Sequence, residues 1–415
     1  MGMNATPASE RVHIGFFGCR NAGKSSVMNA VTGQNLAVVS EVKGTTTDPV
    51  LKSMELLPLG PVVMMDTPGI DDEGELGALR IKKSYQALNK TDLAVLVIDG
   101  TVGALPQDAA LLETIRRKAL PWIVVLNKAE LLSEEAREKT GKEVCQCLHM
   151  TEENQQPLWV SAQTGQGIFE LKERIAALGK QEESDRKIAA DLVCPGDFVV
   201  LVVPIDKAAP KGRLILPQQQ TIRDLLEAGV ASVVVRETEL ADTLSRMGTA
   251  PALVITDSQA FGKVSKITPA DIPLTSFSIL FARYKGMLEA AVRGVRALDT
   301  LKDGDRVLIC EGCTHHRQCD DIGTVKLPNW IRQHTGASPA FSFTSGTEFP
   351  EDVTDYHMVI HCGGCMLNER EMRYRLSCAQ DQGVPMTNYG IAIAYIHGIL
   401  KRSVAPFPEI AALLE

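Results

Sequence analysis

A glycine-rich segment that contains one lysine and one serine has the clearest chemical signature in this sequence. Residues 18–25, Gly-Cys-Arg-Asn-Ala-Gly-Lys-Ser, follow an apolar stretch at Val12–Phe17 and precede a helical pattern at Ser25–Val31. In a loop of this kind the glycines let backbone N–H groups turn toward phosphates, and the helix N-terminus adds a positive end. The pattern predicts a nucleoside triphosphate site in which Lys24 contacts the β- and γ-phosphates and Ser25 binds Mg²⁺.

Four further motifs follow in the order that such a site requires. Asp66-Thr67-Pro68-Gly69 would supply a carboxylate on the metal side and a glycine that senses the γ-phosphate, and Thr46 would be the switch threonine on Mg²⁺. Asn127-Lys128-Ala129-Glu130 stands where a guanine-reading motif belongs, and Ser161-Ala162 would offer a backbone N–H to the base. Lys24, Thr46, Asp66 and Gly69 are the catalytic candidates. The expected nucleotide-binding set is Gly18, Asn21, Ala22, Gly23, Lys24, Ser25, Ser26, Thr46, Asp66, Gly69, Asn127, Lys128, Glu130, Ser161 and Ala162.

These motifs resemble translation-factor-class GTPases, and in particular the tRNA-modification subgroup with Gly-x-x-Asn-x-Gly-Lys-Ser. The guanine motif of that group ends in Asp, whereas Glu130 here places its carboxylate one methylene farther out. Ile70 stands where Ras-like enzymes carry a water-orienting Gln, so we expect slow intrinsic hydrolysis. The resemblance implies that Asn21 helps to bind K⁺, which can replace an arginine finger, and hence that K⁺ stimulates GTP hydrolysis.

A second group of metal-binding residue types lies in the last third of the chain. It consists of Cys313-Thr314-His315 and, after a long interval, His361-Cys362-Gly363-Gly364-Cys365. The two segments follow apolar stretches at Val307–Ile309 and Met358–Ile360. Because ligands gather at the carboxyl ends of strands in a parallel α/β sheet, we expect the two segments to converge.

The residue types leave the metal open. Cys310 and Cys313 with Cys362 and Cys365 could form a four-cysteine zinc site. Alternatively, Cys310 is buried in the core, and the other three thiolates, with an exchangeable fourth position, hold a [4Fe-4S] cluster. Each nearby histidine could be a ligand or could hydrogen-bond around the site.

The combination of motifs resembles the family of [FeFe]-hydrogenase maturation GTPases. The resemblance rests on Cys-x-His, a long interval and His-Cys-x-x-Cys downstream of a GTPase domain of this type. Pro210–Gln218 is similar to the dimerisation domain of that family, and Asn388-Tyr389-Gly390 also fits it. The resemblance covers essentially the whole chain.

This resemblance implies a GTP-hydrolysing scaffold that carries a [4Fe-4S] cluster and a diiron subcluster precursor. Such a scaffold receives the precursor from radical-SAM maturases and delivers it to apo-hydrogenase, while GTP regulates partner association. A homodimer or larger assembly is implied as well. On this sequence, Cys313, Cys362 and Cys365 would hold the cluster, and His315 and His361 are candidates for the fourth ligand or for contacts around the cluster. Cys310, Cys319 and Cys378 have no assigned role.

Three stretches with strand and helix patterns must position these residues. We expect an α/β fold: a P-loop GTPase domain at 1–178, a linker at 179–195, a dimerisation domain at 196–275 and a cluster-binding domain at 276–415, all with mostly parallel sheets. The middle stretch contains no cluster of titratable groups, which favours docking or oligomerisation. In the last stretch we expect long helices at Ile279–Ala297 and Ile391–Arg402.

Composition narrows the function classes. The 415 residues carry a net charge of −8, which disfavours a general nucleic-acid or anionic-membrane binder. The sequence shows neither a secretory signal nor an apolar run of about 20 residues, so we expect a cytoplasmic protein with reduced thiols. Three alternative functions are considered. The first is a tRNA-modification or ribosome-assembly GTPase with structural zinc, but this sequence has no evident RNA-binding tract, and the second is a radical-SAM enzyme, but this sequence has no Cys-x-x-x-Cys-x-x-Cys motif. The third is a plain switch protein whose metal is structural.

Overall fold

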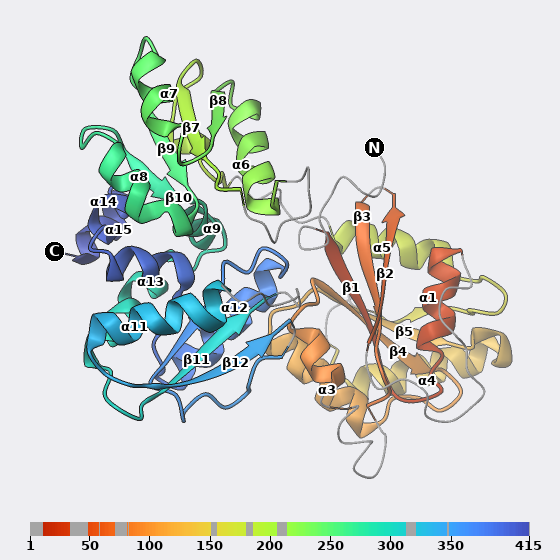
Figure 1. Cartoon of the computed structure of the whole chain (residues 1–415). Coiled ribbons are helices and arrows are strands. Elements are labelled where there is room, and N and C mark those ends of the chain that lie inside the picture. Colours follow the sequence, from red (N-terminus) through yellow and green to blue (C-terminus); the bar gives the residue numbers. More distant parts are fainter. Residues whose placement is uncertain are drawn as a thin grey trace. The chain divides into compact units, whose positions relative to one another are not determined.

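The computed structural model divides the chain into two compact units, Met1–Ser184 and Asp185–Glu415 (Figure 1). Each unit is described by itself. The structure describes residues 11–33, 49–57, 59–70, 81, 83–150, 156–179, 186–205, 214–312, 321–346 and 348–414.

The first unit is built on a six-stranded sheet of order β2-β3-β1-β4-β5-β6. The pair β2 and β3 is antiparallel, and every other neighbouring pair is parallel. Parallel strands need helical crossovers, which bury both faces of the sheet and explain why β1, β4 and β5 are almost wholly apolar. The strands are β1 Val12–Phe17, β2 Val50–Leu56, β3 Gly60–Asp66, β4 Leu93–Asp99, β5 Trp122–Asn127 and β6 Leu158–Trp159.

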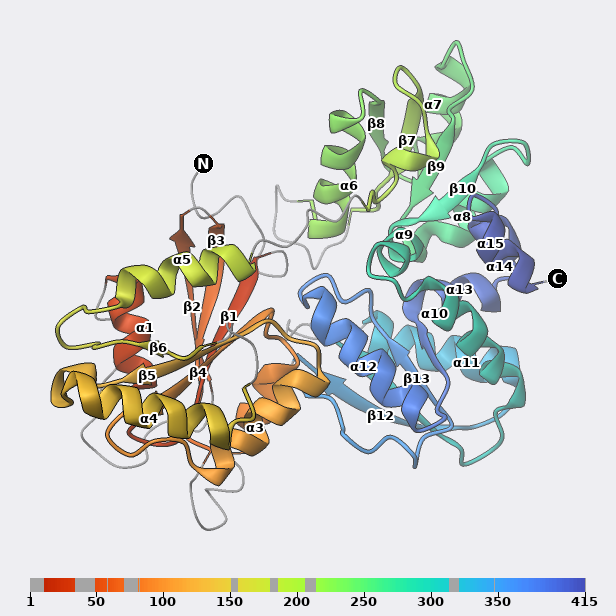
Figure 2. The same cartoon turned by 180° about the vertical axis from the view of Figure 1, so that it is seen from behind.

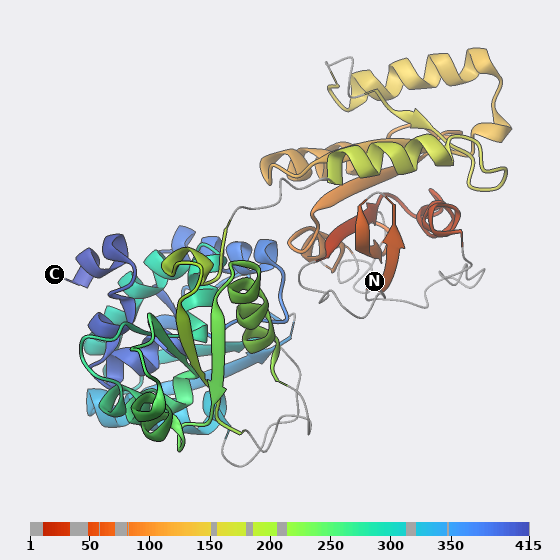
Figure 3. The same ribbon diagram turned by 90° about the horizontal axis from the view of Figure 1, so that it is seen from above.

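Helices cover both faces of this sheet. On one face α1 lies beside α5 (Figures 1 and 3), and the two helices pack over Ile14 and Val95. On the other face α3 and α4 pack over Phe17 and Leu96. This is the layered arrangement of a P-loop GTPase domain, as the sequence predicts. The helices are α1 Lys24–Thr32, α3 Pro106–Arg117, α4 Glu134–Cys147 and α5 Ile168–Gly179.

The second unit contains two four-stranded sheets, both wholly parallel. The first has the order β10-β9-β7-β8 and the second β12-β11-β13-β14. Their strands are β7 Phe198–Val202, β8 Ala231–Val235, β9 Leu253–Thr256, β10 Leu274–Ser276, β11 Arg306–Glu311, β12 Ala340–Ser345, β13 Met358–His361 and β14 Met386–Asn388. The helices are α6 Leu216–Glu227, α7 Leu240–Arg246, α8 Phe261–Ile267, α9 Phe277–Tyr284, α10 Leu288–Gly294, α11 Leu327–Thr335, α12 Glu369–Asp381, α13 Tyr389–Ile396, α14 Leu400–Val404 and α15 Pro408–Ala411.

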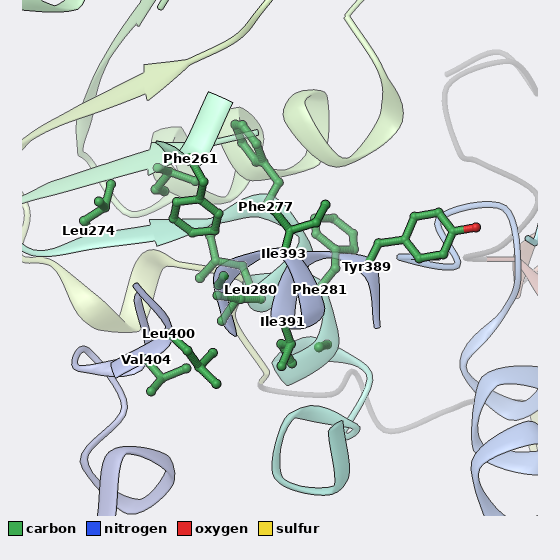
Figure 4. Packing of buried hydrophobic residues seen from close by; sticks show 14 of the residues in the cluster. Phe261, Leu274, Phe277, Leu280, Phe281, Tyr389, Ile391, Ile393, Leu400 and Val404 are labelled. Carbon is green, nitrogen blue, oxygen red and sulfur yellow. The ribbon is translucent and has the colours of Figure 1, made fainter. Parts of the chain in front are cut away.

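One hydrophobic core joins the two sheets of the second unit. Phe261 and Leu274 from the first sheet region and Ile393 and Val404 from the carboxyl-terminal helices belong to the same buried cluster (Figure 4). Arg402 completes the attachment, because its guanidinium donates to the carbonyls of Ser265 and Thr268 at 2.8 and 2.9 Å, among others. The opposite face of the second sheet is covered by α12 (Figure 2), and a separate hydrophobic cluster lies between the two.

The two long helices expected near the carboxyl terminus are wrong as continuous elements. The first is divided at Gly286, which has a φ of +72°, into α9 and α10, and the second is divided at Gly398, with a φ of +69°, into α13 and α14. A residue with positive φ cannot continue a right-handed helix, and glycine adopts that conformation without steric cost. The sequence also does not reveal β2, β10 and β14.

Candidate functional site

The phosphate loop joins the end of β1 to the start of α1 in the conformation that phosphate binding requires. Gly18 and Gly23 have φ values of +140° and +90°, and Asn21 also lies in the left-handed region. A Cβ at Gly18 would lie 2.1 Å from the Val97 carbonyl oxygen, so only glycine fits there. Lys24 is buried, and its Nζ donates to the carbonyls of Gly18 and Cys19 at 3.0 and 2.8 Å. The ammonium is therefore held over the loop.

Ser25 and Asp66 face each other across the end of the sheet. Ser25 Oγ donates to Asp66 Oδ2 at 2.5 Å, and the other carboxylate oxygen is buried and has no hydrogen-bond partner in the part of the chain that the structure describes. Burial raises the pKa of Asp66, although Ser25 and Lys24 oppose the shift. A hydroxyl beside a carboxylate with an open oxygen is an oxygen donor set that suits Mg²⁺.

Asn127 connects the phosphate loop to the base-side loop. Its Nδ2 donates to the Ala22 carbonyl at 3.0 Å, and its Oδ1 accepts the Ala162 N–H at 3.2 Å. Ser161 is fully buried and accepts the Thr164 N–H at 3.0 Å. The amide thus fixes two loops of the expected guanine site relative to each other.

The carboxylate at the end of the guanine motif has an unsatisfied acceptor oxygen, as base recognition requires. Glu130 Oε2 is buried and has no hydrogen-bond partner among the described residues. A buried carboxylate oxygen without a donor is costly unless a ligand supplies one, and the N1–H and N2–H₂ groups of guanine are such donors. Glu130 therefore suits the role that Asp holds in related GTPases.

Four further positions of the expected nucleotide site are Ser26, Thr46, Gly69 and Ile70. Ser26 and Gly69 are half-buried, and Thr46 lies outside the described residues. Ile70 is 4% exposed and packs in the hydrophobic cluster with α3, so it cannot orient a water molecule at a phosphate.

Sequence reasoning missed Asp99 at the end of β4. The Lys128 Nζ lies 2.5 Å from Asp99 Oδ2, and the Thr101 N–H and hydroxyl donate to Asp99 Oδ1. Burial raises the pKa of Asp99, but the hydrogen bonds from Lys128 and Thr101 outweigh it and the net shift is downward. Asp99 thereby fixes the guanine-motif lysine. Its position at a strand end beside β5 was the available signal.

The cysteine segment at 361–365 begins at the carboxyl edge of the second sheet. The register places His361 of β13 beside Cys310 of β11 and Asn388 of β14. The Cys362 N–H donates to the Cys310 carbonyl at 2.8 Å, after which the chain leaves the sheet. We call residues 362–368, which end at the α12 N-cap Asn368, the cysteine loop.

The sulfur of Cys362 lies in a polar backbone cradle. It accepts the N–H groups of Gly312 and Gly364 at 3.0 and 3.4 Å. Burial raises the pKa of the thiol, and these two N–H groups oppose that shift. A Cβ on Gly312 would lie 2.9 Å from Leu367, and Gly364 has a φ of +61°. Backbone N–H bonds to sulfur stabilise a thiolate, so this donor set fits an iron-bound cysteine.

His361 is held by a buried ion pair. Its Nε2 lies 2.9 Å from Arg375 Nη1, and its Nδ1 lies 2.8 Å from the Cys362 carbonyl oxygen. Arginine can only donate, so Nε2 accepts and Nδ1 carries the proton. Arg375 is 0% exposed and also donates to Glu371 and to the Gly346 carbonyl. Burial and the Arg375 charge lower the pKa of His361 to about 3, so both nitrogens of the neutral ring are engaged.

The other cysteines occupy different environments. Cys310 is fully buried in the cluster under α12, and burial raises its pKa to about 12, which favours the neutral thiol. Cys378 lies on α12 and contacts Gln382 and the Glu351 carbonyl. Cys313, His315 and Cys319 lie outside the described residues. Within the described ranges, no three Cys, His, Asp or Glu side chains converge as metal ligands.

Curated relatives match the first unit. GTPase Der of Wolinella succinogenes is 36% identical over 190 residues, which cover 45% of this chain and 39% of that protein. The tRNA modification GTPase MnmE of Desulfotalea psychrophila is 35% identical over 156 residues, 37% of this chain and 32% of that protein. The chain thus spans at most two fifths of the length of these relatives. The solved structure of Era from Aquifex aeolicus with bound GDP and AlF4⁻ is similar at 20% identity, with a TM-score of 0.37, over 57% of this chain and 98% of that one.

Domain families match in three consecutive segments. Residues 13–128 match the 50S ribosome-binding GTPase family, 188–286 the hydrogen maturase F dimerization domain, and 289–406 the hydrogen maturase F tetramerization domain. Together the last two span more than half of the 415 residues. No helix among the described residues is long and apolar enough to cross a membrane. The chain therefore belongs to the hydrogen maturase F family and carries a GTPase domain at its amino-terminal end.

Proposed function

We propose that the chain is a GTP-regulated scaffold in the maturation of [FeFe]-hydrogenase. The second unit holds a [4Fe-4S] cluster and a diiron subcluster precursor, which it receives from radical-SAM maturases and delivers to apo-hydrogenase. GTP binding and hydrolysis in the first unit regulate association with these partners. One observation carries the proposal: two hydrogen maturase F domains, at residues 188–286 and 289–406, follow a GTPase domain in the same chain. The Cys362 sulfur, which accepts two backbone N–H groups at 3.0 and 3.4 Å, supports a thiolate ligand within the second of these domains.

On the nucleotide side, the positions of Lys24, Ser25 and Asp66 support distinct roles. Lys24 contacts the β- and γ-phosphates, and Ser25 and Thr46 bind Mg²⁺ near Asp66. Asn21 takes part in binding K⁺. Because Ile70 is buried in the core, hydrolysis lacks a water-orienting side chain at that position and is slow unless a cation or a partner assists.

On the cluster side, Cys313, Cys362 and Cys365 supply the thiolates. The cluster gives the protein a redox-active iron site with an exchangeable fourth position. His361 orients the Cys362 backbone rather than ligating iron, because Arg375 occupies its Nε2. His315 is the remaining histidine candidate for the fourth position. The described cysteines form no disulfide with one another, which suits the reducing cytoplasm, and the two oligomerisation-domain matches support a homodimer or a larger assembly.

Anaerobic purification followed by reconstitution with iron and sulfide tests this proposal. We expect stoichiometric iron and sulfide, and an EPR signal after reduction. The variant Cys362→Ser should lose the signal, whereas Cys378→Ser, a matched change on α12, should keep it. Stoichiometric zinc without iron would instead support a GTPase with a structural metal site.

A further inference from the structure

Lys285 reaches the cysteine loop from a distant part of the chain. It follows α9, where its N–H donates to the Phe281 carbonyl, and its side chain is 7% exposed. Its Nζ donates to the Gly364 carbonyl and, at 3.0 Å, to the Leu367 carbonyl. These two carbonyls flank Cys365. A buried ammonium thus closes the loop around Cys365, one of the two cysteines of the loop.

The turn at Gly364 is sterically restricted and uses a carbonyl that Lys285 also contacts. Gly364 has a φ of +61°, and a Cβ there would lie 2.5 Å from the Met372 sulfur. The Leu367 N–H donates to the Gly364 carbonyl at 3.0 Å, so one carbonyl accepts from both Leu367 and Lys285. The same turn therefore depends on a local backbone bond and on a charged donor from outside the loop.

Lys285 also adds positive charge where thiolates would accumulate negative charge. Burial raises the pKa of Cys365, and the charge of the Lys285 ammonium is the largest influence that opposes this shift. Three thiolates outweigh the double positive charge of an oxidised [4Fe-4S] cluster, and one-electron reduction adds another negative charge. In a buried site a neighbouring cation stabilises the more negative state more strongly.

We propose that Lys285 is a positioning residue of the cluster site: its ammonium fixes the turn around Cys365 and raises the reduction potential of the bound cluster. The effect on the reduction potential rests on the proposed function. The part that concerns the turn does not, because it is a property of the protein without metal.

Hydrogen exchange of the full-length, metal-free protein tests the turn. In Lys285→Met we expect the Leu367 amide region to exchange about tenfold faster or more, as the loss of charged hydrogen bonds implies. Lys263→Met removes an exposed lysine of α8 and should leave this region unchanged. Equal exchange in the two variants would overturn the positioning role.

A redox titration of the reconstituted protein, with dithionite as the electron donor and EPR as the readout, tests the charge. Lys285→Gln keeps an N–H donor but removes the charge, so its cluster should have a lower reduction potential than the wild type. Lys285→Arg keeps the charge and should stay near the wild type. The same shift in Arg and Gln, or none in Gln, would refute the electrostatic role. Absence of iron from the wild type would instead refute the proposed function and leave the exchange result standing.

Discussion

The buried pair of Arg375 and Glu371 gives the sharpest stability prediction for the second unit. Both lie on α12 four residues apart, with side chains 0% and 5% exposed. The variant Arg375→Met keeps an apolar stem but leaves the Glu371 carboxylate buried without its cation. Removing one partner of a buried pair costs about 3–5 kcal/mol. A domain has only about 5–15 kcal/mol of stability in total, so this loss would be readily measurable.

The same helix provides a matched control. Arg373 pairs with Glu369 at the same spacing, but these side chains are 52% and 38% exposed. Because exposed pairs of this kind contribute about 0.3–0.5 kcal/mol, Arg373→Met should have little effect. The double variant Arg375→Met with Glu371→Met removes both buried charges and should recover most of the loss.

Native-state hydrogen exchange of β13 and α12 peptides is the suitable assay, since it reports the second unit separately from the first. We expect the free energy of opening to fall by several kcal/mol in Arg375→Met and by less than about 1 kcal/mol in Arg373→Met. Equal losses in the two single variants would refute the argument that burial makes the difference.

Four further predictions follow from single residues. Glu130→Ala should weaken GDP binding by about tenfold or more, because the buried Oε2 is an acceptor for the N–H groups of guanine, and Glu130→Asp should retain the binding. An unchanged calorimetric Kd in the Ala variant would contradict this. GTP turnover should be faster in K⁺ than in Na⁺, and equal rates would exclude cation assistance. Burial and the Asp299 bond raise the pKa of Tyr395 to about 12, so the neutral phenol stabilises the fold below pH 10 and this contribution is lost as pH rises toward 12; denaturation of Tyr395→Phe should lack that component. Gly286→Ala should cost about 1–2 kcal/mol in denaturant unfolding because φ is positive there, whereas Gly262→Ala in α8 should not.

The strands that carry the site residues could be predicted because they are apolar runs. β1, β4 and β5 are buried on both faces, so their sequences are continuous and the polar motifs follow them directly. The sequence did not predict β2, because this strand pairs antiparallel at the sheet edge and alternates half-buried with exposed residues. β10 and β14 have three residues each, which is too short for a pattern.

Motif spacing located the candidate residues but could not give their contacts. The pattern His-Cys-x-x-Cys is the same whether His361 binds a metal or holds the backbone. What separates the two roles is Arg375, whose guanidinium occupies Nε2 and whose own charge is balanced by Glu371. Neither side chain belongs to a recognisable motif. The sequence of α12 also does not distinguish the buried Arg375 from the exposed Arg373.

The helix break at Gly286 connects this difficulty with the role of Lys285. In one continuous helix over residues 279–297, Lys285 would lie four residues after Phe281 and three before Leu288, on the same face as these two buried side chains. Because α9 ends at Tyr284, Lys285 instead becomes the residue just past the helix end, and Gly286 turns the chain away with a φ of +72°. The Lys285 side chain donates to the Gly364 and Leu367 carbonyls of the cysteine loop. Helix periodicity could therefore predict that position 285 is buried, but it could not predict that its ammonium contacts the cysteine loop.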